Sequence, residues 1–370
     1  RLDRPTVLRH VDLVLVLLAA ALAALGTLMV YSATRGPATE FRPAETAYLY
    51  RQAVFAGIGI VAMLLAAWFG HRRALRLAAP IYVGLLATLV AVLIAGVEVR
   101  GTRGWFQLGD YRLQPSEFGK IALIVVLAAM LGSAEEVGVF RLSATVVVAS
   151  LPVLAILFQP DLGTLLVYGA ITTGMVLVAG AKGRHLLVLG LLLLTGLVAV
   201  FQSDLLADYQ VARLMVFVDD AQSTAASYNL EQAEVAIGNG GLTGQGLFEG
   251  TQNNSDLVPE QQTDFIFTVI AEETGFVGSI LVLGLIGLLL VRVWRIGRLA
   301  DDRFGLLLAA GVFSMVVFQV FQSVGMATGI MPITGIPLPL VSHGGSSVLT
   351  TFICIGLVES VHMRRHEGSS

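Results

Sequence analysis

Cysteine and charge are both scarce in this sequence. One cysteine among 370 residues, Cys354, leaves no disulfide framework and no paired-cysteine zinc spacing. Charged residues make up 13% of the chain against 56% hydrophobic residues, and the mean hydropathy is +0.81. Because so little polar surface could face water, a soluble globular fold is excluded. The composition indicates an integral membrane protein.

A strongly basic face is also missing. The net charge is −3 and the isoelectric point is near 6.1. Nucleic-acid binding depends on clustered lysines and arginines that neutralise phosphates, so this balance argues against a nucleic-acid partner. Membrane lipid is the expected surrounding instead.

Long apolar runs are abundant. A helix needs about 20 apolar residues to cross the roughly 30 Å hydrocarbon layer. Ten runs approach this length and predict an all-α polytopic membrane fold with about ten transmembrane helices. They cover residues 12–32, 52–69, 75–96, 115–131, 144–158, 162–180, 185–201, 265–291, 304–328 and 347–361. No separate soluble domain is evident, so residues 1–370 are expected to form a single membrane domain.

The basic residues set the expected orientation. Fifteen of the 23 lysines and arginines fall in segments that a cytoplasmic N-terminus places inside, and seven fall in outer segments. Cytoplasmic loops carry such an excess of positive charge, so both termini are expected in the cytoplasm. The long acidic segment 202–263, between helices seven and eight, is then extracytoplasmic. Its glycine-dense part, 238–246, predicts tight turns and close packing rather than a nucleotide site.

Ionisable residues at membrane depth are costly unless they are paired or hydrated, so each is a functional candidate. Glu117 and Lys120 lie three apart in a span that starts at Pro115, and they can neutralise each other. A pair that only fixes helix packing and a pair that contacts substrate are equally supported. Asp161, at a proline corner between two spans, is expected to cap the following helix as a structural group.

The start of the eighth span is the most informative stretch. Four residues recur there at helical spacing: Asp264, Thr268, Glu272 and Gly275. They predict a polar stripe that runs inward from the outer mouth. Asp264 lies at the mouth, where a helix cap is its alternative role. Glu272, about 12 Å deeper at roughly 1.5 Å per residue, is expected to support the site by packing or hydrogen bonding, as is Glu260.

An irregular, proline- and glycine-rich segment, 332–347, separates the last two spans. Non-helical backbone at this depth persists only where it is buried in protein or lines a wet cavity, so a cavity is expected here. A single histidine is weak evidence for chemistry, and His343 is interpreted as structural.

Six motifs occur in one order along most of the chain. They are Gly101-Thr102-Arg103-Gly104-Trp105, Gln114-Pro115-Ser116-Glu117 with Lys120, Gln159-Pro160-Asp161-Leu162-Gly163-Thr164, Ala236-Ile237-Gly238 with Gly240-Gly241, Pro259-Glu260 to Glu273, and Pro337-Leu338-Pro339 to Ser347. In this combination the sequence resembles the SEDS family (shape, elongation, division and sporulation). Gly250-Thr251-Gln252 is more similar to the elongation branch than to the division branch.

The resemblance implies a peptidoglycan glycosyltransferase that polymerises lipid II at the outer face of the bacterial cytoplasmic membrane. It also implies a class B penicillin-binding protein, a transpeptidase, as partner. The family's essential carboxylate belongs to a His-Thr-Asp-Phe-Ile-Phe motif and matches Asp264. Two positions depart from the family pattern: Gln262 replaces the His of that motif, and His343 replaces the Tyr of a Ser-Tyr-Gly-Gly-Ser-Ser motif.

The chemistry fits these residues. Joining two sugars needs a base for the acceptor hydroxyl and stabilisation of the leaving diphosphate. Asp264 suits the first task, since an aspartate with an ordinary pKa of about 3.9 is ionised at pH 7. The candidate contacts to lipid II are Arg103, Glu117, Lys120, Arg213, Ser342 and Ser346. No metal-ligand spacing is recognisable, although a divalent cation, Mg²⁺ or Mn²⁺, could assist at the diphosphate.

Two other functions stay open. A lipid II flippase needs polar access from both leaflets, whereas the polar features cluster toward the outer side and favour catalysis there. The Glu117 and Lys120 pair could still line a transport path. A non-catalytic scaffold for the transpeptidase would not need Asp264 at all.

Overall fold

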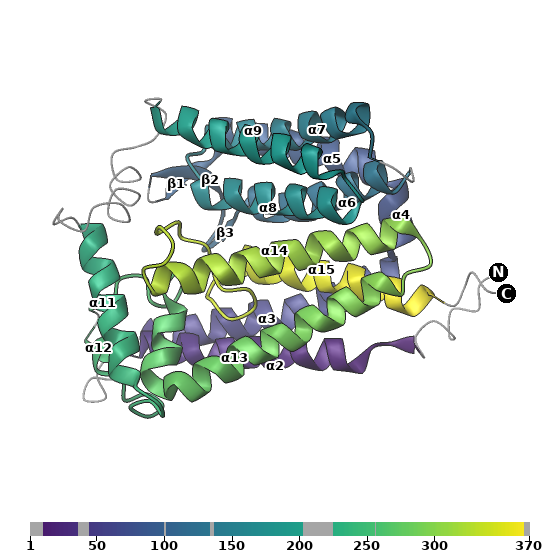
Figure 1. Ribbon diagram of the computed structural model, residues 1–370. Helices are drawn as coiled ribbons and strands as arrows, with labels where there is room; N and C mark the ends of the chain where they lie inside the picture. Colours follow the sequence, from purple (N-terminus) through teal and green to yellow (C-terminus); the bar gives the residue numbers. More distant parts are fainter. Residues whose placement is uncertain are drawn as a thin grey trace.

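The computed structural model describes residues 10–35, 44–99, 101–133, 137–202, 225–255 and 257–365. Its helices are α2 (Leu13–Thr34), α3 (Ala44–Phe69), α4 (His71–Arg76), α5 (Ala78–Ala95), α6 (Pro115–Gly132), α7 (Val139–Leu157), α8 (Leu162–Val178), α9 (Gly183–Gln202), α11 (Ala225–Gly240), α12 (Thr251–Asn254), α13 (Ile266–Arg298), α14 (Arg303–Ala327) and α15 (Gly345–Arg364). Most run roughly along one direction, with the start of α2 and the end of α15 at the same end of the molecule (Figure 1). The predicted helical membrane architecture is confirmed.

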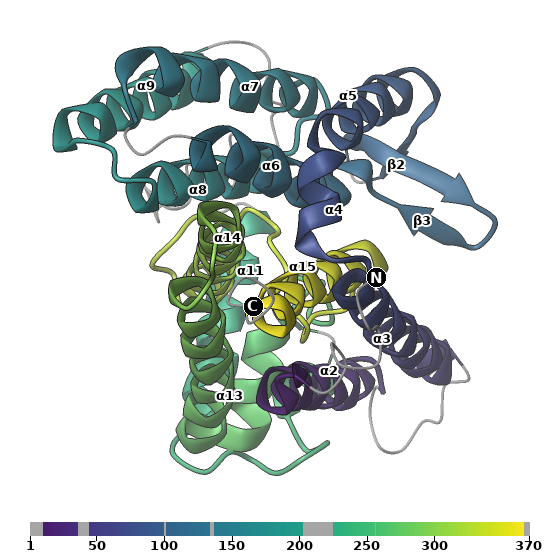
Figure 2. The same ribbon diagram turned by 90° about the vertical axis from the view of Figure 1, so that its right-hand side faces the viewer.

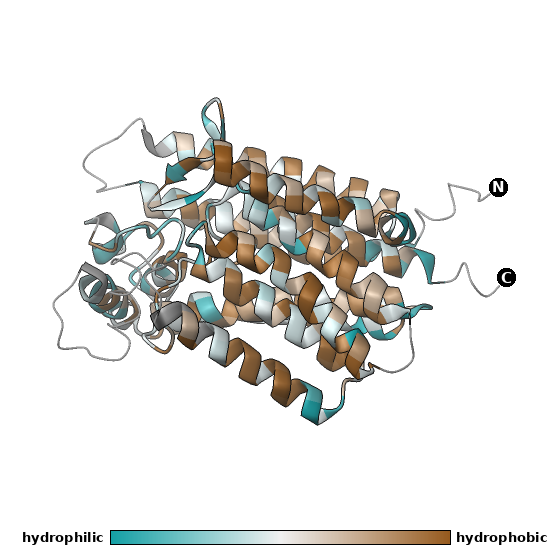
Figure 3. Ribbon diagram, turned by 90° about the horizontal axis from the view of Figure 1, so that it is seen from above, coloured by the Kyte–Doolittle hydropathy of each residue, from teal (hydrophilic) through white to brown (hydrophobic). Residues whose placement is uncertain are grey.

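Eight of the described helices are long and apolar enough to cross a membrane. Two shorter apolar helices, α8 and α9, occupy the two remaining predicted spans. Hydrophobic residues dominate the helices, and hydrophilic residues gather toward the two ends of the molecule (Figure 3). The chain is therefore a multi-pass membrane protein, and a count of ten crossings stays a prediction.

Several helices begin where the local sequence indicates. Asp12 caps α2 by accepting hydrogen bonds from the N–H groups of Val14 and Leu15. Asp302 caps α14 in the same way through Gly305. A carboxylate in this position satisfies N–H groups that have no partner inside the helix and favours its positive end. These caps fix where the spans start.

Viewed along their axes, the helices form two groups (Figure 2). One contains α5 to α9, and the other contains α2, α3, α13 and α15, while α14 contacts α6 and α8 on one side and α13 on the other. Small residues permit the closest packing: a Cβ on Gly356 of α15 would lie 2.2 Å from the carbonyl oxygen of Met63 in α3. Membrane helices approach closely through such residues.

A small antiparallel sheet precedes α6 and was not predicted. Its strands are β1 (Val97–Val99), β2 (Thr102–Leu108) and β3 (Tyr111–Leu113), in the order β1-β2-β3. Gly109 and Asp110 connect β2 to β3, and Gly109 has a left-handed φ of 63°. This two-residue turn is a hairpin signal that hydropathy does not register. The sheet lies at the end of the molecule opposite the start of α2 and the end of α15 (Figure 1).

The described part of segment 202–263 contains α11 and α12 at that same end (Figure 1). Its glycine-dense stretch packs on the backbone of α13: a Cβ on Gly240 would lie 1.9 Å from the carbonyl oxygen of Ala271. The N–H groups of Gln245 and Gly246 donate to the carbonyls of Glu272 and Glu273. The prediction of tight turns and close packing is confirmed.

Candidate active site

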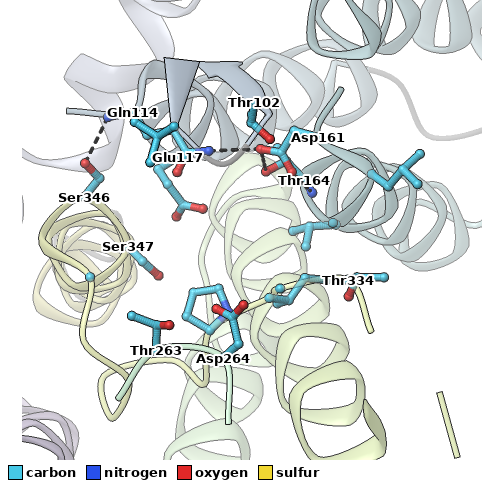
Figure 4. A pocket seen from close by; sticks show the side chains of 18 of the residues that line it. Thr102, Gln114, Glu117, Asp161, Thr164, Thr263, Asp264, Thr334, Ser346 and Ser347 are labelled. Atoms are coloured by element: carbon cyan, nitrogen blue, oxygen red, sulfur yellow. Dashed lines mark hydrogen bonds between the residues drawn. The ribbon is translucent and has the colours of Figure 1, made fainter. Parts of the chain in front are cut away.

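A cavity of about 280 Å³ lies where the sheet, the segment before α13 and the segment between α14 and α15 meet. Four helices, α6, α8, α13 and α15, begin at or beside it. Asp264 projects from one side, while Glu117 and Asp161 lie on the opposite side and Ser346 and Ser347 on a third (Figure 4). The irregular segment 332–347 therefore lines a cavity, as predicted.

The starts of these helices make the cavity suitable for an anion. The first N–H groups of a helix have no partner inside it and lie at the positive end of the helix dipole. No cap-residue side chain bonds to these N–H groups at the starts of α6, α13 and α15, where the cap residues are Gln114, Phe265 and Gly344. Such helix starts favour phosphate groups.

A tight turn places Asp264. The carbonyl oxygen of Glu260 accepts from the N–H groups of Thr263 at 3.1 Å and Asp264 at 3.0 Å, and Glu260 has a left-handed φ of 57°. Across the cavity, a Cβ on Gly335 would lie 3.2 Å from Asp264 Oδ2, and Gly335 itself has a φ of 71°. Only glycine suits position 335, since it combines this φ with close approach to the carboxylate.

The predicted polar stripe needs correction. Because α13 begins only at Ile266 after the turn at Glu260, Asp264 lies outside the helix and its spacing to Thr268 and Glu272 is not helical. Thr268 donates to the carbonyl of Phe265, and neither Thr268 nor Glu272 lines the cavity. The cap position belongs to Phe265, so the alternative of Asp264 as helix cap is not supported.

Glu272 instead organises the segment before Asp264. Its carboxylate accepts from the N–H groups of Gln252 at 2.7 Å and Asn253 at 3.0 Å, at the start of α12. It is buried, with 1% of its surface exposed. The predicted hydrogen-bonding role of Glu272 is confirmed, and Glu260 supports the site through its turn.

Glu117 and Lys120 form the predicted ion pair at the start of α6. Lys120 Nζ lies 2.6 Å from Glu117 Oε1, both side chains are buried, and both line the cavity. The second carboxylate oxygen of Glu117 has no hydrogen-bond partner among the described residues. The pair is thus buried within α6 and also lines the cavity wall, while its direct contact with substrate stays a prediction.

Asp161 caps α8, as predicted, and also bridges to α6. Its carboxylate accepts from the N–H of Thr164 at 3.0 Å, from the Thr164 hydroxyl at 2.7 Å and from Gln114 Nε2 at 2.9 Å (Figure 4). Burial raises the pKa of Asp161 above its ordinary value, even though the Thr164 hydrogen bonds oppose the shift. Asp161 therefore fixes one wall of the cavity.

The two candidate serines have different places. Ser346 lines the cavity at the start of α15, and its hydroxyl accepts from the N–H of Gln114 at 3.1 Å (Figure 4). Ser342 is buried outside the cavity lining, and its hydroxyl accepts from the N–H of Leu338 at 2.8 Å. The hydroxyl of Ser342 closes a turn of the chain, and its substrate contact stays a prediction.

Of the two candidate arginines, the structure describes only Arg103. Arg103 is exposed on β2 and donates through Nε to the carbonyl of Gly96 at 3.2 Å, outside the cavity lining. This contact reaches the end of α5, and a substrate contact for Arg103 stays a prediction. Arg213 lies outside the described residues.

The sequence analysis missed Gln52, a buried residue in the first third of α3. Its side chain contacts the carbonyl of Ser342 and the ring of His343, and His343 lines the cavity. A glutamine at the start of an apolar run was the available signal. Among the described residues, no group of three or more His, Cys, Asp or Glu side chains could hold a metal ion.

Comparison with known proteins gives the family. Residues 12–367 match the family model described as cell cycle protein, FtsW/RodA/SpoVE. The chain is 37% identical to stage V sporulation protein E of Bacillus subtilis, covering 95% of this chain and 96% of that protein. It is 34% identical to the probable peptidoglycan glycosyltransferase FtsW of Geobacter metallireducens over 95% of both chains. It is 32% identical to peptidoglycan glycosyltransferase MrdB of Escherichia coli K12 over 96% of this chain and 94% of that one.

Solved structures agree. One, from a study of how a peptidoglycan synthase complex coordinates polymerization and crosslinking, has a TM-score of 0.82 and 35% identity, covering 96% of this chain and 99% of that one. The rod shape determining protein RodA of Thermus thermophilus has a TM-score of 0.71 and 34% identity, covering 96% and 98%. The chain belongs to the SEDS family, the family of FtsW, RodA and SpoVE, as its six motifs indicated.

Proposed function

We propose that this chain is a peptidoglycan glycosyltransferase that polymerises lipid II into β-1,4-linked glycan strands, with Asp264 as general base. Relatives that align over nearly the whole chain carry the name peptidoglycan glycosyltransferase. The observation that supports the chemistry most directly is the cavity itself, where Asp264 faces a buried lysine and the starts of four helices. One wall suits a base, and the others suit an anion.

The proposed reaction divides between these walls. A carboxylate oxygen of Asp264 takes the proton of the acceptor 4-hydroxyl as that oxygen attacks the anomeric carbon of the donor. The bond from this carbon to the diphosphate oxygen breaks, and the diphosphate leaves with the bonding electrons. Lys120 and the uncapped N–H groups at the start of α6 stabilise the developing negative charge. A single displacement inverts the anomeric configuration.

We also propose where and with what the chain works. The excess of basic residues at the end that holds the termini supports an active site on the outer face of the bacterial cytoplasmic membrane. The likeness to a chain from a peptidoglycan synthase complex supports a class B penicillin-binding protein as partner. Motif Gly250-Thr251-Gln252 and the likeness to RodA support a role in cell elongation.

A divalent cation is proposed to accompany the diphosphate. Since the described residues offer no cluster of three metal-ligating side chains, the cation would be held mainly by the oxygens of the diphosphate. We expect EDTA to abolish polymerisation and Mg²⁺ or Mn²⁺ to restore it. Undiminished turnover by metal-free protein would exclude the cation.

The test uses labelled lipid II in liposomes, with the partner's transpeptidase inactivated by a β-lactam. The wild type and Asp110→Asn, which changes an exposed aspartate in the hairpin turn, should both form polymer. Folded Asp264→Asn should form none. Transfer of lipid II between leaflets without polymer would support a flippase instead. Normal wall synthesis in cells that carry Asp264→Asn would support a scaffold.

A further inference from the structure

The side-chain amide of Gln52 has a fixed orientation. Gln52 is buried, with 1% of its surface exposed, and one end of its amide lies 3.2 Å from the carbonyl oxygen of Ser342. A carbonyl oxygen can only accept, so that end must be the NH₂ group. The amide oxygen, Oε1, therefore faces Nδ1 of His343 at 3.0 Å.

This orientation determines the tautomer of His343. Because Oε1 of Gln52 can only accept, Nδ1 of His343 must carry a proton and donate it. In a neutral imidazole the other nitrogen, Nε2, then keeps its lone pair. Nε2 has no hydrogen-bond partner among the described residues and is not closed off from solvent.

The ring is held from several sides. The backbone N–H of His343 donates to the carbonyl of Gln262 at 2.9 Å, two residues before Asp264. Tyr48 packs against the imidazole edge-on, with ring centroids 5.2 Å apart. Burial, reinforced by the nearby charge of Arg51, lowers the pKa of His343 to about 4, so the ring is neutral at pH 7. His343 also lines the cavity that contains Asp264.

We propose that Nε2 of His343 accepts a hydrogen bond from a hydroxyl or amide N–H of the substrate's saccharide and so positions the sugar in the cavity. This inference rests on the proposed function. A neutral acceptor repels phosphate oxygens, whereas Lys120 and the start of α6 attract them. The two features together orient the substrate, with the sugar toward α3 and His343 and the diphosphate toward α6. His343 is then a binding residue, and Gln52 is the positioning residue that fixes its tautomer.

Two substitutions separate this role from a structural one. His343→Asn keeps an N–H near the position of Nδ1 for Gln52 but removes Nε2, whereas His343→Gln places an amide near Nε2 and gives up the bond to Gln52. Loss of one hydrogen bond to bound substrate should raise KM about fivefold and leave kcat within about twofold. We expect this change for His343→Asn and a KM nearer the wild type for His343→Gln. His10→Asn, which changes an exposed histidine just before α2, serves as the control.

A higher KM for His343→Gln than for His343→Asn would overturn the proposal, because a ring with a purely structural role needs its bond to Gln52. Equal KM values for all variants would overturn it as well. A second measurement does not depend on turnover: ¹⁵N-histidine-labelled Asp264→Asn protein is titrated with lipid II, and the Nε2 signal, assigned by its loss in His343→Asn, is followed. A shift of the Nε2 signal on binding supports the inference even if the wild type makes no polymer. Absence of polymer would refute only the proposed function. Polymer from the wild type with an unmoved signal refutes the inference alone.

Discussion

At the scale of single residues, the buried ion pair of Glu117 and Lys120 predicts how substitutions change the stability of the protein. Removing one partner of a buried ion pair leaves a charge without compensation and costs about 3–5 kcal/mol. Lys120→Met should therefore lower the thermal unfolding temperature in detergent sharply, while Lys182→Met, which changes an exposed lysine, should leave it unchanged.

The double variant Glu117→Gln/Lys120→Met sharpens this test. It removes both charges and should recover most of the lost stability. It should not recover polymerisation, because the diphosphate still lacks the positive charge of Lys120. Recovery of both stability and activity would show that the pair only supports packing.

Residues with a local role were predictable. Asp161 before a helix and the spacing of Glu117 and Lys120 each specify a contact within a few residues. Arg103 and Ser342 also have local partners, seven and four positions away, but each of these bonds joins a side chain to a backbone group that the residue pattern does not single out, so neither contact was predicted. The Gln52 contact spans 291 positions and could not be predicted from local spacing.

At the scale of elements, the kink in α13 depends on one glycine. Gly275 has φ 66° and ψ −164°, a conformation that essentially only glycine adopts, and a Cβ there would lie 2.3 Å from the N of Gly244. Gly275→Ala should destabilise the protein by about 2 kcal/mol or more and reduce polymerisation, since the first part of α13 follows Asp264.

Gly287→Ala is the matched control for this prediction. It lies in the same helix, and its Cβ would meet no atom within 4 Å. We expect equal or slightly higher stability, since alanine favours a helix over glycine by about 1 kcal/mol. Equal thermal melts of the two variants would contradict the assigned role of Gly275.

Hydropathy predicted the long helices because burial in lipid imposes a run of apolar residues. It missed the sheet, whose strands β1 and β3 are only three residues long. It also missed the kink at Gly275, because apolar periodicity does not report backbone dihedral angles. Both features lie beside the cavity or lead into it, so the site was less predictable than the bundle.

At the scale of the whole molecule, orientation can be measured in intact cells. Cys354 is buried and is the only cysteine in the sequence. Labelling by a maleimide therefore reports on a single introduced cysteine. Asp110→Cys, in the hairpin turn, should react with a membrane-impermeant maleimide, while Asp301→Cys, between α13 and α14, should react only after the cells are opened. The reverse pattern would place the cavity on the cytoplasmic face.

The central claim is that Asp264 performs base catalysis in polymerising lipid II. The most direct measurement is the initial rate of glycan polymer formation by the wild type and by Asp264→Asn in the same liposomes, after matching thermal melts show that both are folded. General-base catalysis contributes roughly 10²–10⁴-fold, so the variant should be slower by at least about 100-fold. A rate within a few-fold of the wild type would contradict the claim.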